Sequence, residues 1–173
     1  MKHALIVIDM QQGAGIDAAR LIRRLNRLAA AVRARNGLVV YIQHAGPPGD
    51  PFHPGQPGWK LMPTLDVRSD DAIIAKTACD SFLGTTLEAH LRDQDVGRLI
   101  ITGWATDYCV DTAVRSALAR GLPTVAPSDG HTCGDRPHVP ALKVIEHHNA
   151  VWADFISPAG AATVIPCANL RLG

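Results

Sequence analysis

The chain lacks several features that would assign it to a specialised class of protein. Lysine and arginine total 17 against 16 acidic residues, so the basic excess typical of nucleic-acid-binding proteins is absent. The apolar run near the amino terminus, residues 4–8, is too short for a signal peptide or a membrane span. The four cysteines show neither a CxxC pair nor a metal-ligand spacing. We therefore expect a soluble, cytoplasmic protein with reduced thiols that binds neither nucleic acid nor membrane.

The composition is that of an ordinary globular domain. The chain has 173 residues, of which 47% are hydrophobic and 19% charged. This apolar content is enough for one sizeable core and argues against disorder, and the length is short for two domains. No repeat, low-complexity tract or linker interrupts the chain. We therefore expect residues 1–173 to form a single domain.

Short apolar, mostly β-branched runs alternate with segments of helical periodicity along the chain. The expected strands are residues 4–8, 38–43, 72–75, 98–102, 123–126 and 150–155. The expected helices are residues 15–36, 85–94, 108–120 and 139–147. A stretch rich in proline and glycine, residues 45–59, follows the second strand, and its length indicates a functional loop.

This alternation predicts an α/β fold with a mostly parallel, Rossmann-like sheet of six strands. Continuous apolar strands are typical of sheets that helices cover on both faces, which gives three layers, α/β/α. In such folds ligands bind beyond the carboxyl ends of the strands. The reactive side chains at those ends are therefore the candidates for chemistry.

Three such side chains stand out, namely Asp9 after the first strand, Lys76 after the third and Cys109 after the fourth. A thiol at a helix amino terminus feels the positive end of the helix dipole, which favours the thiolate. Each residue also has a plainer interpretation, because a cysteine can be a small core residue, an aspartate a turn residue and a lysine a solvated charge. Their joint placement at one edge of one sheet favours the catalytic interpretation.

The motifs around these three residues resemble those of the isochorismatase-like cysteine hydrolases, a family that includes nicotinamidases and N-carbamoylsarcosine amidohydrolase. The resemblance covers residues 4–155 and is carried by three segments in the family's order: LIVIDMQQG, IIAKTACDSFLGTTLEAHL and LIITGWATDYCVDTAVRSALARG. It implies the isochorismatase-like hydrolase fold. It also implies hydrolysis of a small amide, ureido or related C–N substrate through a thioester, without an organic cofactor.

The resemblance assigns a role to each residue. Cys109 would be the nucleophile, Asp9 would move the proton, and Lys76 would stabilise the anionic forms of both. A cis peptide between Trp104 and Ala105 is implied, with the backbone N–H groups of Ala105 and Cys109 forming an oxyanion hole. Family members are commonly dimers or tetramers, so a homodimer or homotetramer is implied.

Residues around the expected cleft are candidates for binding a small-molecule substrate. They are Gln11, His44, Trp59, Phe82, Trp104, Tyr108 and His131. The Asp-x-His cluster of metal-dependent nicotinamidases is missing, and the spacing of His44 and His53 matches no common zinc signature, so we expect no metal. Three alternatives stay open: a metal-assisted nicotinamidase-like hydrolase, a vinyl-ether hydrolase of the isochorismatase type, and a non-catalytic binding module on the same fold.

Overall fold

A parallel sheet forms the centre of the computed structural model, which describes residues 1–172. The strands are β1 (Lys2–Ile8), β2 (Leu38–His44), β3 (Ala72–Lys76), β4 (Val96–Trp104), β5 (Thr124–Val125) and β6 (His131–Thr132). They lie in the order β3-β2-β1-β4-β5, and β6 pairs with the end of β4. All these pairings are parallel, as the alternation of strands and helices predicts.

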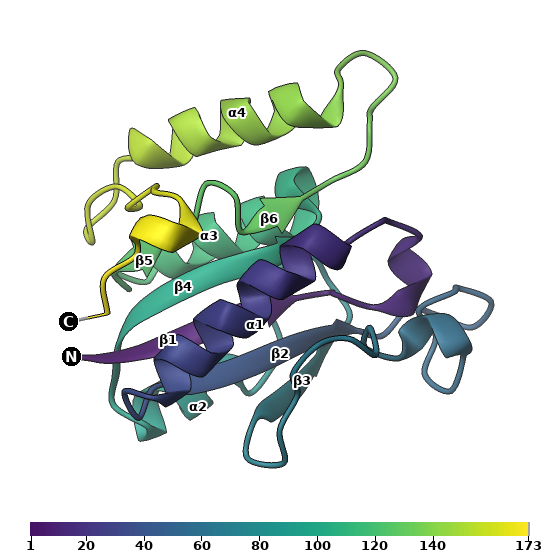
Figure 1. The fold of residues 1–173 in the computed structure, drawn as a ribbon, viewed down its shortest axis with the longest axis horizontal. Helices are drawn as coiled ribbons and strands as arrows, with labels where there is room; N and C mark the ends of the chain where they lie inside the picture. The colour runs from purple at the N-terminus through teal and green to yellow at the C-terminus, as the bar shows by residue number, and fades with distance from the viewer. Residues whose placement is uncertain (173) are drawn as a thin grey trace.

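Helices cover both faces of this sheet (Figure 1). They are α1 (Ala19–Arg33), α2 (Leu87–Asp93), α3 (Asp111–Ala119) and α4 (Ala141–Ala153). Leu5 and Val7 of β1 pack in the core beneath α1 and the carboxyl-terminal segment, whereas Ile6 and Ile8 belong to the core beneath the other three helices. Because neighbouring side chains of a strand point to opposite faces, one apolar strand supplies both cores. The three-layer α/β/α prediction is confirmed.

The predicted strand at residues 150–155 is wrong. Helix α4 continues to Ala153, and the sixth strand of the sheet is instead the two-residue β6. The apolar run that favoured a strand contains Trp152, which is fully buried and lies eight residues after the buried Val144. That separation places both side chains on one face of a helix, so burial against the sheet side of α4 decides its conformation.

All four predicted helices begin two to four residues later than expected, and the structure explains the delay for α1 and α3. Residues 15–36 contain a helix only from Ala19, because a 3-10 turn at Gln12–Ala14 ends at Gly15, whose φ is +61°. The helix expected from residue 108 is preceded by a wide π-helical turn, Thr106–Val110, and α3 starts at Asp111. The cysteine at 109 therefore lies in this turn and not in the first turn of an α-helix.

The carboxyl ends of β1, β2, β3 and β4 meet at one edge of the sheet, and the loop of residues 45–59 extends beyond it at the right of Figure 1. Gly103 lets β4 approach β1 at this edge. Its φ is +120°, and a Cβ there would lie 2.2 Å from the carbonyl oxygen of Ile8. None of the helices within residues 1–172 is long and apolar enough to cross a membrane.

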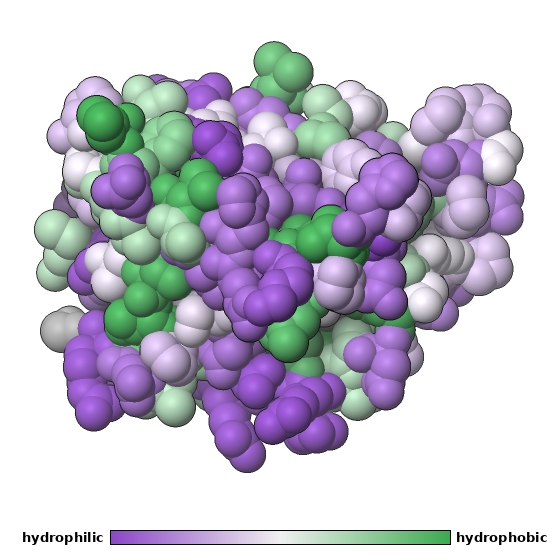
Figure 2. All heavy atoms as spheres, turned by 90° about the horizontal axis from the view of Figure 1, so that it is seen from above, coloured by the Kyte–Doolittle hydropathy of each residue, from purple (hydrophilic) through white to green (hydrophobic). Residues whose placement is uncertain are grey.

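The face that carries α4 is mixed in character. Its apolar side chains form several small patches separated by hydrophilic ones, with no broad apolar area (Figure 2). Leu142 in α4 and Ile156 just after it are large apolar side chains that stay exposed.

Candidate functional site

The strand order brings Asp9, Lys76 and Cys109 together at the carboxyl edge of the sheet. Asp9 follows the central strand β1, Lys76 ends β3, and Cys109 lies in the turn after β4. Asp9 has a φ of +50°, a left-handed conformation that few non-glycine residues adopt, and its N–H donates to the carbonyl of Ile42 at 2.9 Å. The backbone thus turns its side chain beyond the edge of the sheet.

The ammonium group of Lys76 joins the other two side chains. Lys76 Nζ lies 2.7 Å from Asp9 Oδ2 and donates to Cys109 Sγ at 3.2 Å and to the carbonyl of Ala78 at 3.0 Å. Both Lys76 and Asp9 are 2% exposed. An ammonium group has three donors, so all three are used within this cluster.

One cation compensates two acidic groups in this cluster, and the pKa values reflect that imbalance. Burial raises the pKa of the Asp9 carboxyl, although Lys76 opposes the shift. Burial and the Asp9 charge together raise the pKa of the Cys109 thiol, against the pull of Lys76. Burial disfavours the charge of Lys76, but its two acidic neighbours outweigh that effect and raise its pKa.

The expectation that a helix dipole holds Cys109 as a thiolate is therefore wrong for the free protein. With one cation present, a second negative charge in a buried site is costly, so the thiol and carboxyl cannot both ionise easily. Because an aspartate is the stronger acid of the two, the resting arrangement is Asp9 carboxylate, Lys76 ammonium and Cys109 thiol.

The turn that carries Cys109 is anchored from its other side by a buried polar chain. The Trp104–Ala105 peptide bond, just before the turn, is cis. Thr106 Oγ1 lies 2.9 Å from His131 Nδ1, and His131 Nε2 lies 3.1 Å from Asn149 Oδ1. The Asn149 amide donates its own N–H to the carbonyl of Ser128, so its oxygen accepts from His131 Nε2–H and His131 Nδ1 accepts from Thr106. Burial lowers the pKa of His131 to about 4, so this imidazole is neutral.

A cavity of about 290 Å³ opens in front of Cys109. Its lining residues are Asp9, His44, Asp50, Phe52, Cys79, Trp104, Ala105, Tyr108, Cys109 and Arg136. The rings of Phe52 and Trp104 stack with centroids 6.1 Å apart, and His44 meets Phe52 edge-on at 6.0 Å. Three polar atoms of residues that line this cavity, Asp9 Oδ1, His44 Nδ1 and Trp104 Nε1, are buried without a hydrogen-bond partner among the described residues.

The structure brings His44, Trp104 and Tyr108 into this cavity but leaves the other candidate binding residues outside its lining. Gln11 supports the wall, because its amide donates to the carbonyls of His44 and Trp59 and accepts from the His44 N–H. Phe82 is 5% exposed and packs in the core, with Arg120 over its ring at 4.7 Å.

Asp50, Phe52, Cys79 and Arg136 line the cavity although the sequence did not single them out as binding residues. Asp50 and Phe52 belong to the loop of residues 45–59, and the length of this loop was the feature of the sequence that indicated a functional role. Arg136 follows β6 and reaches the site through Asp107, to which it makes two hydrogen bonds of 2.7 and 2.8 Å. Nothing in the sequence pattern indicates that pairing.

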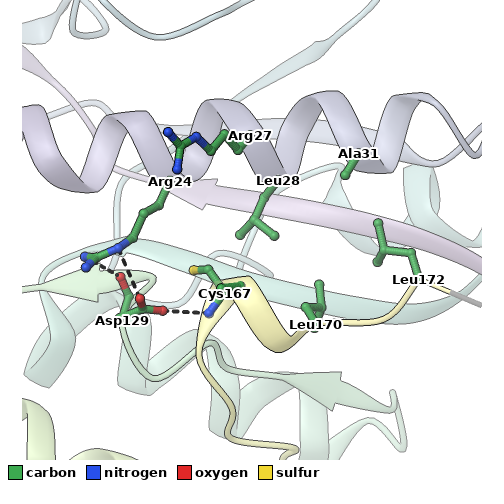
Figure 3. Close-up of a pocket in the computed structure, with 9 residues that line it drawn as sticks. Arg24, Arg27, Leu28, Ala31, Asp129, Cys167, Leu170 and Leu172 are labelled. Carbon is green, nitrogen blue, oxygen red and sulfur yellow. Dashed lines mark hydrogen bonds and ion pairs between the residues drawn. The ribbon is translucent and has the colours of Figure 1, made fainter.

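A second cavity, of about 220 Å³, lies between α1 and the carboxyl-terminal segment (Figure 3). Asp129 closes one end by pairing with Arg24 at 3.1 Å and accepting the N–H of Cys167 at 2.7 Å. Burial, together with Asp129, raises the pKa of Cys167 to about 12, so this thiol is not an activated nucleophile. The cluster ties the end of the chain to α1.

Metal-binding side chains do not gather in the part of the chain that the structure describes. Within residues 1–172, no group of three or more His, Cys, Asp or Glu side chains is arranged to hold a metal ion. His53, one of the two histidines considered in the loop, has its Nδ1 3.1 Å from the carbonyl of Gly46.

Comparison with known proteins identifies a consistent set of relatives. The family model described as the isochorismatase domain matches residues 3–157. A streptothricin hydrolase from Streptomyces noursei is 32% identical over 179 residues, which cover 96% of this chain and 71% of the relative. A ureidoacrylate amidohydrolase from Variovorax paradoxus is 30% identical over 157 residues, which cover 66% of this chain and 62% of the relative. A crystal structure of an isochorismatase family protein superposes with a TM-score of 0.85 at 28% identity, covering 94% of this chain and 97% of that one.

Proposed function

This chain belongs to the isochorismatase family, and we propose that it is a hydrolase of small amide, ureido or related C–N substrates with Cys109 as its nucleophile. Two of its relatives are named as a streptothricin hydrolase and a ureidoacrylate amidohydrolase, which supports hydrolysis of a C–N bond. The observation that carries the proposal is the Lys76 ammonium group, which contacts the carboxylate of Asp9 and the thiol of Cys109 at once.

The reaction begins with a proton transfer within this cluster. As Cys109 Sγ attacks the substrate carbonyl carbon, its proton moves to the Asp9 carboxylate. The negative charge of the cluster thereby passes from Asp9 through the sulfur to the carbonyl oxygen, while Lys76 stays positive. Because the thiol loses its proton only during attack, its raised pKa in the free protein is compatible with this role.

The tetrahedral intermediate then collapses to a thioester. In this proposal the backbone N–H groups of Ala105 and Cys109 stabilise the oxyanion. The C–N bond breaks, and the leaving nitrogen takes the proton that Asp9 holds. In the second half, Asp9 removes a proton from water as the water attacks the thioester, and it returns that proton to the departing sulfur of Cys109. The cycle releases the amine and the acid.

The stacked rings of Phe52 and Trp104 form the recognition wall, with His44 and Tyr108 beside them. Their faces suit a planar or apolar part of a small substrate. In this proposal the substrate contacts Trp104 Nε1–H and His44 Nδ1, which are buried and have no hydrogen-bond partner among the described residues. Gln11, Trp59, Phe82 and His131 act in this proposal by holding the wall and the nucleophile turn in place.

Trapping the acyl intermediate tests the proposal. A panel of small amides and ureido compounds is incubated with the protein, quenched in acid, and measured by intact mass and peptide mapping. We expect an adduct on Cys109 with the mass of the acyl group, and none in Cys109→Ala. Turnover without any adduct, retained in Cys109→Ala, would contradict a thioester mechanism and favour direct attack by water.

The assembly and location of the chain remain predictions. We propose a homodimer or homotetramer, which sedimentation velocity at several protein concentrations measures. A cytoplasmic location is proposed with it, and cell fractionation tests that point.

A further inference from the structure

The charges around the Cys109 cavity do not cancel, and the remaining charge belongs to Asp50. Asp9 is paired with Lys76, and Asp107 is paired with Arg136 through two hydrogen bonds. Burial and the nearby Lys76 lower the pKa of His44, which leaves that ring neutral at pH 7. Asp50 lines the same cavity, and its carboxylate has no ion-pair partner within residues 1–172.

Asp50 is held next to the aromatic wall by its own loop. Its Oδ1 accepts the N–H of Phe52 at 2.7 Å, which fixes the carboxylate two residues before the ring that stacks on Trp104. An aromatic ring attracts a cation over its face, and a nearby carboxylate adds to that attraction. The same mouth already shows such a contact, because the Arg136 guanidinium lies 5.1 Å from the centre of the Tyr108 ring.

An anionic substrate finds no equivalent partner at this mouth. Arg136 is the guanidinium that lines the cavity, but Asp107 already compensates its charge through two hydrogen bonds, so an incoming carboxylate would have to share this one cation with Asp107. Asp50 would repel the incoming anion as well. The lining therefore favours positive charge over negative.

We infer that the Cys109 cavity selects substrates that carry an organic cation, an alkylammonium or guanidinium group, which is placed between the Asp50 carboxylate and the rings of Phe52 and Trp104. This inference rests on the proposed function for its link to a substrate, because the cation would accompany the amide that Cys109 attacks. The electrostatic selection itself can be measured without turnover.

Charged thiol reagents measure this selection directly. Cys109 is modified with the cationic reagent 2-(trimethylammonium)ethyl methanethiosulfonate and with the anionic 2-sulfonatoethyl methanethiosulfonate, in a Cys79→Ser background because the exposed Cys79 lines the same cavity. Peptide mapping assigns the modified cysteine. The ratio of the cationic to the anionic rate is compared with the same ratio for free 2-mercaptoethanol, a thiol that carries no other charged group.

The rate ratio for Cys109 is expected to exceed the reference by about tenfold at low salt and to fall as the ionic strength rises. Asp50→Asn should lower the ratio about fivefold or more, and Asp50→Glu should restore most of it. The asparagine oxygen can still accept the Phe52 N–H, so the loop keeps its hydrogen bond. Asp70→Asn is the matched control, because Asp70 is exposed and precedes β3 at the opposite edge of the sheet. The rate ratio of this variant should equal that of the parent protein. A ratio that Asp50→Asn leaves unchanged, or a preference for the anionic reagent, would overturn the inference.

A pair of amide substrates separates this inference from the proposed function. One carries a trimethylammonium group and the other the neutral tert-butyl group of the same shape. If the cationic amide has the lower KM and Asp50→Asn removes that difference with little change in kcat, Asp50 acts in binding. If neither amide is hydrolysed although the reagent ratio favours the cation, the hydrolase proposal is wrong and the cation selection stands. If both amides are hydrolysed with equal KM, the selection is wrong and the hydrolase proposal stands.

Discussion

Lys76 Nζ lies 3.2 Å from Cys109 Sγ, although β2 and β1 separate the strands that lead to these two residues. The lysine side chain extends along the carboxyl edge of the sheet, and on its way it contacts Asp9 at the end of β1. A buried ammonium group between a carboxylate and a thiol has a cost in desolvation that only its partners offset. The burial of each of these three side chains therefore depends on the other two, and several predictions concern them.

Replacing the proposed nucleophile should abolish hydrolysis without affecting the fold. Cys109→Ala removes the sulfur that forms the thioester, so we expect turnover of a small amide to fall at least about 1000-fold. Cys167→Ala is the matched control, because Cys167 lies at the second cavity and should leave the rate unchanged. Steady-state assays of both variants, with thermal melts to check folding, make the comparison. Equal rates in the two variants would contradict the assignment of Cys109.

The pH dependence should report the carboxylate of Asp9. Its pKa is raised by burial, and the base form is lost as the pH falls through that raised value. The acid limb of kcat/KM should therefore lie above the pKa of about 3.9 of an ordinary aspartate. Measured between pH 4 and 9, an acid limb at or below that ordinary value would contradict Asp9 as the proton acceptor.

Removing the cation should affect both activity and stability. Lys76→Met leaves a buried carboxylate without its partner, which typically costs about 3–5 kcal/mol of the free energy of unfolding. It should also raise the pKa values of Asp9 and Cys109 further, so we expect turnover to fall at least about 1000-fold. Urea unfolding at pH 7 measures the stability.

The double variant Lys76→Met/Asp9→Asn provides the control for this experiment. Because the double variant removes both charges, its loss in the free energy of unfolding should be smaller than the sum of the losses in the two single variants. Strictly additive losses would show that the two side chains do not depend on each other for burial.

His131 should make the protein less stable in mild acid. Its pKa is lowered from 6.5 to about 4, so the unfolded chain binds a proton that the folded chain excludes. Stability should be full above pH 6.5 and decline as the pH falls toward 4, by about 3 kcal/mol in total, since each pH unit contributes about 1.4 kcal/mol.

The variant His131→Gln tests the source of this decline. It should be less stable than the parent at pH 7 but lose less stability between pH 6.5 and 4, as measured by urea unfolding at each pH. His138→Gln, a change at an exposed histidine, should keep the parent's decline. The same decline in His131→Gln as in the parent would assign the effect to other groups.

Two phenylalanines should respond differently to the same substitution. Phe52 lines the cavity, so Phe52→Ala should raise KM about tenfold and have little effect on the free energy of unfolding. Phe82 is buried in the core, so Phe82→Ala should cost about 3–5 kcal/mol of stability and leave KM close to that of the parent. Kinetics and urea unfolding on both variants test this contrast. A larger change in KM for Phe82→Ala than for Phe52→Ala would contradict the assignment of substrate binding to the cavity that Phe52 lines.

The errors in the sequence-based prediction have physical causes. The run around Trp152 is apolar enough to resemble a strand, but Trp152 is buried on the same helix face as Val144, eight residues earlier, where α4 packs on the sheet. A local pattern does not contain that partner surface. The thiolate expected at Cys109 failed for a similar reason, because burial and the facing Asp9 carboxylate arise only when β1 and β4 are neighbours.

The sequence by itself determined the order of the first five strands and the first three helices, the three-layer fold and the positions of Asp9, Lys76 and Cys109 at strand ends, because each follows from local periodicity and from the geometry of parallel sheets. Only the tertiary structure decided which residues line the cavity. Phe52 and Asp50 reach it from a loop without regular periodicity, and Arg136 is held there by Asp107, 29 residues earlier in the chain. Such contacts depend on the path of the loops and on pairing between distant residues, and no local pattern in the chain encodes them.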